Sequence, residues 1–370
     1  MVFNMENDSK VIVVNATALS SGGALTILRQ FIAHAEIYKK KFIIFIPTNV
    51  KVKPCPNIKY VKIDTKSWVR RIWWDFIGLK SELKKRSVKY SLCISLQNTS
   101  VNIDCEQLIY LHQPLPFTTV RYSFNKETVK YFLYKWFYKL FIFLFSSTET
   151  RFVVQTRWMK AALLQNGVLE ERISIFTPDI KLPTGYDANC RGGGAKSVNN
   201  DKATFFYPAS PLFYKNHLMI LDALSILKSQ PLNKVPIFAV TFNSGDYPVF
   251  DEKAKKLDLI DNISYLGGLP YDKVIEKYIS ADAVLFPSYI ETFGLPLAEA
   301  GVLGKKIICA DLPYSRDVLD DYQGATFLDY QNAKLWASVI CDVMHQSSMS
   351  QYSPLSFSQC ATWQDFFDFI

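Results

Sequence analysis

Short apolar runs rich in Val, Ile and Phe recur along the whole chain and alternate with longer stretches of helical periodicity. Runs without polar alternation are typical of parallel strands that are buried on both faces. They predict strands at Val11–Asn15, Lys41–Ile46, Ser91–Ser95, Leu108–His112, Phe152–Gln155, Ile173–Phe176, Thr204–Tyr207, Ile237–Thr241, Ile263–Leu266, Ala283–Phe286, Lys306–Cys309 and Thr326–Leu328. The alternation of strands with helices indicates α/β layers.

One long stretch, Thr177–Ala203, interrupts this alternation. It contains Pro178, Pro183, Gly185 and the run Gly192–Gly194, with little apolar periodicity, as is typical of a connection with a surface loop. A chain of 370 residues is also longer than one ordinary core requires. We therefore expect an α/β fold of two doubly wound, Rossmann-like domains that face each other across a cleft.

The expected domain boundaries follow from this division. They are an N-terminal Rossmann-like domain at 1–180, a linker and surface loop at 181–203, a C-terminal Rossmann-like domain at 204–353 and a last helix within 354–370 that packs back on the N-terminal domain. In open α/β sheets, ligands bind at the carboxyl ends of the strands. Candidate site residues are therefore expected in the loops that follow predicted strands.

The composition describes a globular chain with 49% hydrophobic and 21% charged residues. Its net charge of +8 favours anionic partners, which include phosphates, nucleic acid and acidic lipid headgroups. The seven Cys residues form no CxxC pair, so a reducing cytoplasm is expected. The first ten residues are unlike a signal peptide, and the apolar stretch Leu140–Phe145 is far shorter than the ~18 residues of a membrane-spanning helix.

The most informative segment follows the predicted strand Ala283–Phe286 and continues as PSYIETFGLPLAEAGVLGKK. Pro296 suits the start of a short helix and Gly304 suits its end. Glu291 then lies in the loop and Glu299 in the first helical turn. Main-chain amides at a helix start can bind an anion, and two carboxylates beside a bound phosphate could accept hydrogen bonds from sugar hydroxyls.

This segment resembles the Glu-x7-Glu signature of retaining family-4 glycosyltransferases, which have the GT-B fold. Glu291 and Glu299 fall on its two acidic positions, with Phe293, Gly294 and Leu295 between them. The resemblance implies that a nucleotide-diphosphate sugar is the co-substrate and that no separate cofactor is used. It places Glu291 near the donor sugar and Glu299 near the ribose, and it assigns the three intervening residues to donor binding.

Neighbouring segments extend the resemblance over most of the C-terminal half. The family's nucleobase-contacting loop is similar to YLGGLP, which assigns Gly267 and Gly268 to the donor site. The family's Arg-x4-Lys diphosphate clamp is half present, because Lys215 matches the lysine while Ser210 stands in place of the arginine. Lys215 and helix amides would then offset the diphosphate charge. No convincing DxD-type metal motif is found, so a metal-independent reaction is expected.

Three places in the N-terminal half are further candidates. Gly22 and Gly23 follow the first predicted strand, where small residues let main-chain amides approach a phosphate, and they resemble the family's first loop near the donor diphosphate. His112 ends a predicted strand and resembles the family's active-site histidine, with a core histidine as the alternative. Asn98 and Thr99 follow another strand and are candidates on the acceptor side.

Two segments of the N-terminal half, 68–86 and 129–145, combine cations with many aromatic residues. Nucleic acid is disfavoured as a partner because no nucleic-acid-binding fold signature accompanies them. In 129–145 the lysines form no clean polar stripe, so burial and bilayer contact both remain open. In 68–86 we expect salt-sensitive binding to anionic membranes through Arg70, Arg71, Lys84, Lys85 and Arg86, together with Trp73 and Trp74.

The expected function is retaining, metal-independent transfer of a hexosyl group. The donor would be held by the C-terminal domain and a glycan or polyprenyl-linked acceptor by the N-terminal one, in surface polysaccharide biosynthesis. Glu291, His112 and Lys215 are the catalytic candidates, in a protein that is cytoplasmic or peripheral at the inner face of the membrane. Two alternatives stay open: another GT-B enzyme such as a nucleotide-sugar epimerase, and a catalytically silent subunit that supports a partner, which Ser210 keeps plausible.

Overall fold

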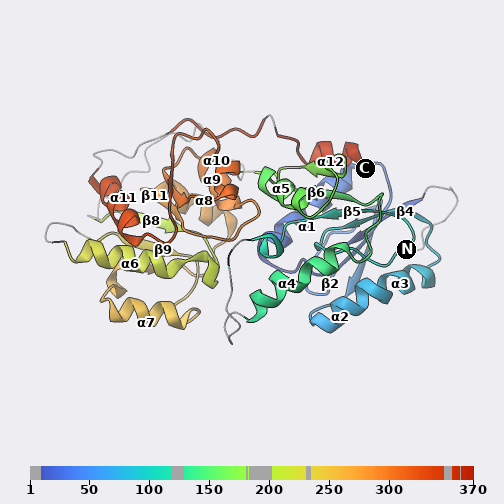
Figure 1. The fold of residues 1–370 in the computed structure, drawn as a ribbon, viewed down its shortest axis with the longest axis horizontal. Helices are drawn as coiled ribbons and strands as arrows, with labels where there is room; N and C mark the ends of the chain where they lie inside the picture. The colour runs from blue at the N-terminus through green and yellow to red at the C-terminus, as the bar shows by residue number, and fades with distance from the viewer. Residues whose placement is uncertain are drawn as a thin grey trace. The chain divides into compact units, whose positions relative to one another are not determined.

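The computed structural model describes residues 10–118, 120, 129–180, 182, 202–230, 235–345, 352–358 and 360–370. The chain divides into two compact units (Figure 1). Unit 1 comprises residues 1–179 and 359–370, and unit 2 comprises residues 180–358. Most of the linker predicted at 181–203 lies outside the described residues.

Unit 1 is built on a seven-stranded parallel sheet of order β3-β2-β1-β4-β5-β6-β7. Its strands are β1 (Val11–Asn15), β2 (Phe42–Pro47), β3 (Ile58–Ile63), β4 (Tyr90–Ser95), β5 (Glu106–Tyr110), β6 (Arg151–Val154) and β7 (Ile173–Ile175). Its helical elements are α1 (Gly22–Ile37), α2 (Trp68–Trp73), the π-helical η1 (Trp74–Gly78), α3 (Leu79–Lys85), α4 (Val129–Phe143), α5 (Arg157–Gln165) and α12 (Trp363–Phe369), with short 3-10 turns η2 (Leu115–Phe117) and η3 (Glu170–Arg172).

Unit 2 has a six-stranded parallel sheet of order β10-β9-β8-β11-β12-β13. Its strands are β8 (Thr204–Tyr207), β9 (Ile237–Val240), β10 (Ile263–Tyr265), β11 (Ala283–Phe286), β12 (Ile307–Ala310) and β13 (Ala325–Leu328). Its helical elements are α6 (His217–Lys228), α7 (Pro248–Lys256), α8 (Tyr271–Ser280), α9 (Leu295–Val302), α10 (Pro313–Leu319) and α11 (Ala333–His345), with 3-10 turns η4 (Phe213–Lys215) and η5 (Ile260–Asn262).

The central strands are buried on both faces, as their unbroken apolar runs predict. In β1, Val14 packs in the cluster that contains helices α1 and α12, whereas Val13 packs in a second cluster with Trp74 and Leu83. Val13 pairs with Ile43 of β2 and with Cys93 of β4, so the strand sits in the middle of the sheet. The prediction of α/β architecture with two doubly wound sheets is confirmed.

Strand β3 was missing from the predicted set, and its sequence explains why. Lys59 and Lys62 divide its sequence, IKYVKI, into short apolar pieces, and only Ile58 and Val61 are buried. The strand lies at the edge of the sheet, where charged side chains and partial exposure are common. A search for unbroken apolar runs therefore passes over it. Strand β5 also ends at Tyr110, so His112 lies two residues beyond the strand in which it was predicted.

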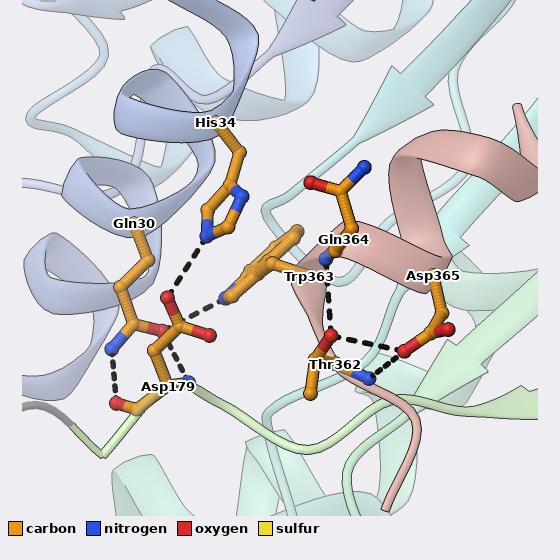
Figure 2. A network of polar contacts seen from close by, with 7 residues as sticks. All are labelled: Gln30, His34, Asp179, Thr362, Trp363, Gln364 and Asp365. Atoms are coloured by element: carbon orange, nitrogen blue, oxygen red, sulfur yellow. Dashed lines mark hydrogen bonds and ion pairs between the residues drawn. The ribbon is translucent and has the colours of Figure 1, made fainter. Parts of the chain in front are cut away.

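Helix α12 belongs to unit 1, although the 179 residues of unit 2 precede it in the chain, and Figure 2 shows Trp363 of α12 beside Gln30 and His34 of α1. The ring of Trp363 stacks on Tyr110 with a centroid distance of 5.3 Å and lies edge-on to Phe31 of α1 at 5.9 Å. Gln30 of α1 links the two places where the chain crosses between units. Its Oε1 accepts from Trp363 Nε1 at 2.8 Å, and its Nε2 donates to the carbonyl oxygen of Asp179 at 2.7 Å.

Two further bonds secure these crossings. His34 Nε2 lies 2.9 Å from Asp179 Oδ2, and Thr177 N donates to Ala361 O at 2.8 Å. At the start of α12, the Thr362 hydroxyl and the Asp365 carboxylate form a capping box. Among the described residues, no helix is long and apolar enough to cross a bilayer.

Candidate active site

The switch point of the unit 2 sheet lies between β8 and β11, because the strand order proceeds outward in both directions from this pair. Lys215, in the turn that follows β8, forms an ion pair with Glu291, in the loop that follows β11. Their side chains are only 16% and 15% exposed. Ligands of doubly wound sheets bind at the carboxyl ends of strands at such a switch point. The structure thus brings two predicted site residues together where a ligand is expected.

Several bonds hold the two loops around this pair. Ser288 Oγ donates to Glu291 Oε1 at 2.8 Å, and the Tyr314 hydroxyl donates to Ser288 O at 2.6 Å. The Tyr207 hydroxyl donates to Lys215 O at 2.9 Å. Because each partner is itself bonded, the lysine and the carboxylate are held in place before any ligand arrives.

Asn216 joins a third loop to this arrangement. It adopts a left-handed conformation, with φ of 62°, directly before α6. Its side-chain Nδ2 donates to Tyr330 O at 2.8 Å and to Pro287 O at 3.3 Å. The loops that follow β8, β11 and β13 are therefore connected through one side chain.

Glu299 lies in the second turn of α9, which corrects the prediction that placed it in the first. The helix begins at Leu295, so its first turn holds no acidic residue. Glu299 Oε2 accepts a hydrogen bond from the Tyr278 hydroxyl at 2.9 Å, and Tyr271 is a second hydrogen-bond partner. Burial raises the pKa of Glu299 to about 7, against the lowering effect of the two tyrosine bonds. Its carboxylate can accept paired hydroxyl groups, which suits a ribose.

Two of the predicted glycines of unit 2 have backbone conformations that favour glycine. Gly294 has φ of 81° and precedes α9, and a Cβ there would lie 3.3 Å from Leu297 Cδ1. Gly267 has φ of 64°, and a Cβ there would lie 2.7 Å from Asn243 Oδ1. Gly268, next to it, is exposed with open space around it.

The other predicted donor-binding residues of unit 2 have different surroundings. The side chain of Phe293 is buried and its ring contacts Phe357, with centroids 6.1 Å apart, so it stabilises the loop from inside. Leu295 is the first residue of α9 and is half-buried. Ser210 is exposed, and its carbonyl accepts from Leu212 N at 2.8 Å. A longer side chain at Ser210 would therefore start from the surface of the β8 loop.

In unit 1 the switch point lies between β1 and β4. Gly22 and Gly23 begin α1 just beyond β1, are exposed, and have no atom within 4 Å of an added Cβ. His112 Nε2 lies 2.8 Å from Leu96 O, and its main-chain N donates to Asn98 Oδ1 at 2.5 Å. Burial lowers the pKa of His112, so the ring is neutral near pH 7.

A buried carboxylate at the same switch point was missed by the sequence reasoning. Asp75, in the π-helical η1, accepts hydrogen bonds from Asn15 Nδ2 at 3.1 Å, Gln97 Nε2 at 2.8 Å and Thr99 Oγ1 at 2.9 Å. Burial raises its pKa to about 7. The predicted acceptor-side residue Thr99 therefore directs its hydroxyl into this network. The available signal was an acidic residue between Trp74 and Phe76 in an otherwise apolar stretch.

Trp74 corrects part of the predicted membrane-binding set. Its side chain is buried, and its Nε1 donates to Asn15 Oδ1 at 3.0 Å, so it cannot contact a bilayer. Helix α2 is followed by a π-helical turn, and this turn directs Trp74 and Asp75 inward while Trp73 stays exposed. Single π-turns of this kind occur frequently at functional sites.

His217, directly after the Lys215 loop, is fully buried, and among the described residues neither ring nitrogen has a hydrogen-bond partner. Burial, with a smaller effect of the Lys215 charge, lowers its pKa to about 3. The unfolded chain therefore binds the proton first as pH falls below ~6.5, and the folded state is destabilised in the window between pH 6.5 and 3. Replacing His217 with Leu should remove this pH-dependent destabilisation of the folded state.

We expect the free energy of unfolding of His217→Leu, relative to the unmodified protein, to rise by about 1.4 kcal/mol between pH 7.5 and 5.5. Urea unfolding at the two pH values, followed by a signal from unit 2, measures this difference. His345→Leu is the matched control, because that side chain is exposed. A difference that does not change with pH would show that the buried ring takes up a proton as readily as an exposed one.

Comparison with known proteins shows that this chain is similar to glycosyltransferases. Residues 194–353 match the family model described as glycosyl transferases group 1. A D-inositol 3-phosphate glycosyltransferase of Mycolicibacterium vanbaalenii is 33% identical over 94 residues, which cover 25% of this chain and 20% of that protein. The aligned segment thus spans about a fifth of that relative.

Two solved structures are similar over nearly the whole chain. WaaG, a glycosyltransferase involved in lipopolysaccharide biosynthesis, superposes with a TM-score of 0.67 at 13% identity, over 92% of this chain and 91% of that one. The Anabaena protein HepE, in complex with UDP and glucose, superposes with a TM-score of 0.62 at 12% identity, over 92% and 91%. At these identities the likeness shows the fold, which is GT-B.

Proposed function

We propose that this chain, whose C-terminal unit is a group 1 glycosyltransferase domain, transfers a hexosyl group from a nucleotide-diphosphate sugar with retention of configuration. The observation that carries the proposal is the Lys215–Glu291 pair at the unit 2 switch point. Unit 2 would hold the donor and unit 1 the acceptor. The HepE structure with UDP and glucose supports a nucleotide sugar as the donor.

Each residue of the unit 2 site has a role in this proposal. Lys215 would offset the charge that grows on the diphosphate as the sugar departs, which a bound metal ion does in other enzymes. Glu291, held by Ser288, would accept a hydrogen bond from a hydroxyl of the transferred sugar. Glu299 would accept from the ribose hydroxyls, in exchange for one of its tyrosine bonds.

The chemical step would use the donor itself. A diphosphate oxygen, freed as the bond to the anomeric carbon breaks, would take the proton of the attacking acceptor hydroxyl on the same face of the sugar. His112, neutral and held by Leu96, would bind a sugar hydroxyl through its remaining ring nitrogen. In this scheme no side chain of the site forms a covalent intermediate.

Replacing Glu291 or Glu299 with Gln is expected to preserve the fold and lower transfer by about 10- to 150-fold, since each loses a hydrogen bond to a charged group worth roughly 1.5–3 kcal/mol. Donor hydrolysis or transfer, measured after a thermal-shift screen of UDP-, GDP- and ADP-sugars, tests this. Glu252→Gln, an exposed acidic residue of α7, is the matched control. Full transfer by both folded variants would refute the site assignment.

Other outcomes of the same assay separate the alternatives. A protein that binds donor but neither hydrolyses nor transfers it would be a supporting subunit. A protein that releases an epimerised sugar would be a nucleotide-sugar epimerase. Transfer to an added acceptor, with the anomeric configuration followed by NMR, distinguishes retention from inversion.

For the acceptor we propose a glycan or a polyprenyl-linked saccharide of surface polysaccharide biosynthesis. The role of the structurally similar WaaG in lipopolysaccharide biosynthesis supports this class. A lipid-linked acceptor would bring the protein to the cytoplasmic face of the membrane as a peripheral enzyme. Anionic headgroups there attract basic surfaces.

A further inference from the structure

Helix α4 exposes an apolar face on the surface of unit 1. Leu133, Trp136, Phe137, Leu140 and the following Leu144 are between 42% and 65% exposed. At ~100° per residue these five positions fall within about 100° of one another, so they form a single stripe. A soluble helix normally turns polar residues to this side. The stripe is therefore a surface that favours a partner.

The opposite side of α4 packs into the unit and is apolar as well. Tyr138 and Ile142 are buried in a cluster with β5, β6 and α5. Ser100 N donates to Phe141 O at 3.0 Å, which ties the helix to the loop after β4. The inner side of α4 already supplies its contacts with the core of unit 1. Core packing therefore does not explain why the outer side is apolar as well.

Helix α2 and the turn η1 extend the stripe. The ring of Trp68 lies edge-on to Tyr134 of α4 at 5.3 Å and to Phe141 at 5.8 Å, so the two helices are adjacent (Figure 1). Val69, Trp73 and Ile77 on this segment are more than half exposed. Of the eighteen exposed large apolar side chains among the described residues, nine lie on α2, η1 and α4 or directly after α4. Half of the exposed large apolar side chains of the described residues thus gather on adjacent elements of one unit, as is typical of interaction sites.

The helices that carry the stripe, and α3 directly after them in the chain, contain more basic than acidic residues. Helix α4 contains lysines and no acidic residue. Lys84 and Lys85, at the end of α3, are exposed, and neither has an ion-pair partner among the described residues. Of the cations expected from sequence to bind a membrane, Arg70 is paired with Asp64 and Arg86 with Glu82. Because their charges are partly neutralised by these ion pairs, the two arginines should attract anionic headgroups less than the lysines do.

We propose that the outer face of α4, together with α2 and η1, lies in the interface of an anionic lipid bilayer. Exposed Trp68, Trp73 and Trp136 would sit at headgroup level, where tryptophan is enriched, and the leucines would reach the acyl chains. The free lysines at the end of α3, which follows η1 directly, would pair with acidic headgroups. A protein partner would require complementary acidic groups for the same lysines. The inference rests on the proposed membrane-linked acceptor and defines the surface that would meet the lipid.

Co-sedimentation with vesicles tests this surface. The full chain should bind vesicles of mixed phosphatidylglycerol and phosphatidylcholine at low salt and bind phosphatidylcholine alone weakly. Replacing Trp136, Phe137 and Leu140 together with Ser should lower binding at least ~10-fold at any salt concentration. Lys84→Glu with Lys85→Glu should lower binding at low salt and reduce its salt dependence. The matched control replaces exposed Val249 and Leu335 of unit 2 with Ser.

Three results would overturn the proposal. They are no binding to anionic vesicles at low salt, unchanged binding by the triple variant, and a concentration-dependent dimer that the triple variant abolishes while vesicles are not bound. Donor hydrolysis measured on the same protein separates this proposal from the one on transfer. A variant that has lost vesicle binding but hydrolyses donor at the original rate would support the surface and leave the active site intact.

Discussion

Lys215→Ala is expected to weaken binding of the nucleotide diphosphate by about 10- to 150-fold, because it removes a hydrogen bond between charged groups worth roughly 1.5–3 kcal/mol. The effect should be at the upper end of this range, since Glu291 would remain at the switch point without its cation and would repel the phosphates. Isothermal titration with the diphosphate identified by the donor screen measures the affinity.

Two further variants test whether this effect is specific to the site. Lys253→Ala breaks a similar ion pair in the same unit, with Asp222 at 2.7 Å, away from the switch point, and should leave the affinity unchanged. Ser210→Arg adds a second cation from the exposed start of the loop and should increase the affinity. If Lys215→Ala binds the diphosphate as well as the unmodified protein, the phosphates are held elsewhere.

Trp363→Ala should destabilise unit 1 by about 3–5 kcal/mol, the usual cost of truncating a buried aromatic side chain to Ala. The ring is 1% exposed and contacts Tyr110 and Phe31, and its indole N–H is the partner of Gln30. Hydrogen exchange should show faster exchange of the α1 amides, while α6 in unit 2 keeps its protection.

Trp136→Ala is the matched control for this prediction. It removes the same side chain from a site that is 65% exposed, where truncation usually changes stability by less than ~0.5 kcal/mol. Equal effects of the two variants, or protection of α1 unchanged by Trp363→Ala, would show that α12 does not contribute to the stability of unit 1.

The sequence was most informative where one physical constraint dominated. Strands buried on both faces leave unbroken apolar runs, so β1 and β11 could be located within a residue. The Glu-x7-Glu segment was recognisable because loop, helix start and carboxylates follow each other along the chain. That Lys215 meets Glu291 could only be expected through resemblance, since the two are 76 positions apart in the sequence.

The rest depended on contacts that local patterns do not encode. Asp75 lies in an apolar, basic segment, and only the π-helical turn directs it to Asn15, Gln97 and Thr99. The stripe on α4 was ambiguous because the helix is apolar all round, and the structure decides which side is packed. The hydrogen bonds between Glu299 and the tyrosines of α8 likewise could not be predicted, because nothing in the sequence spacing of these residues indicates that they meet.

The return of α12 to unit 1 has a consequence for synthesis on the ribosome. All of unit 2 must be translated before Trp363, Phe366 and Phe367 emerge, so the apolar face of α1 around Phe31 stays uncovered during that time. Domains usually complete folding in the order in which they are made. Here the later unit can finish first, and the nascent N-terminal unit would depend on chaperones until its own last helix arrives.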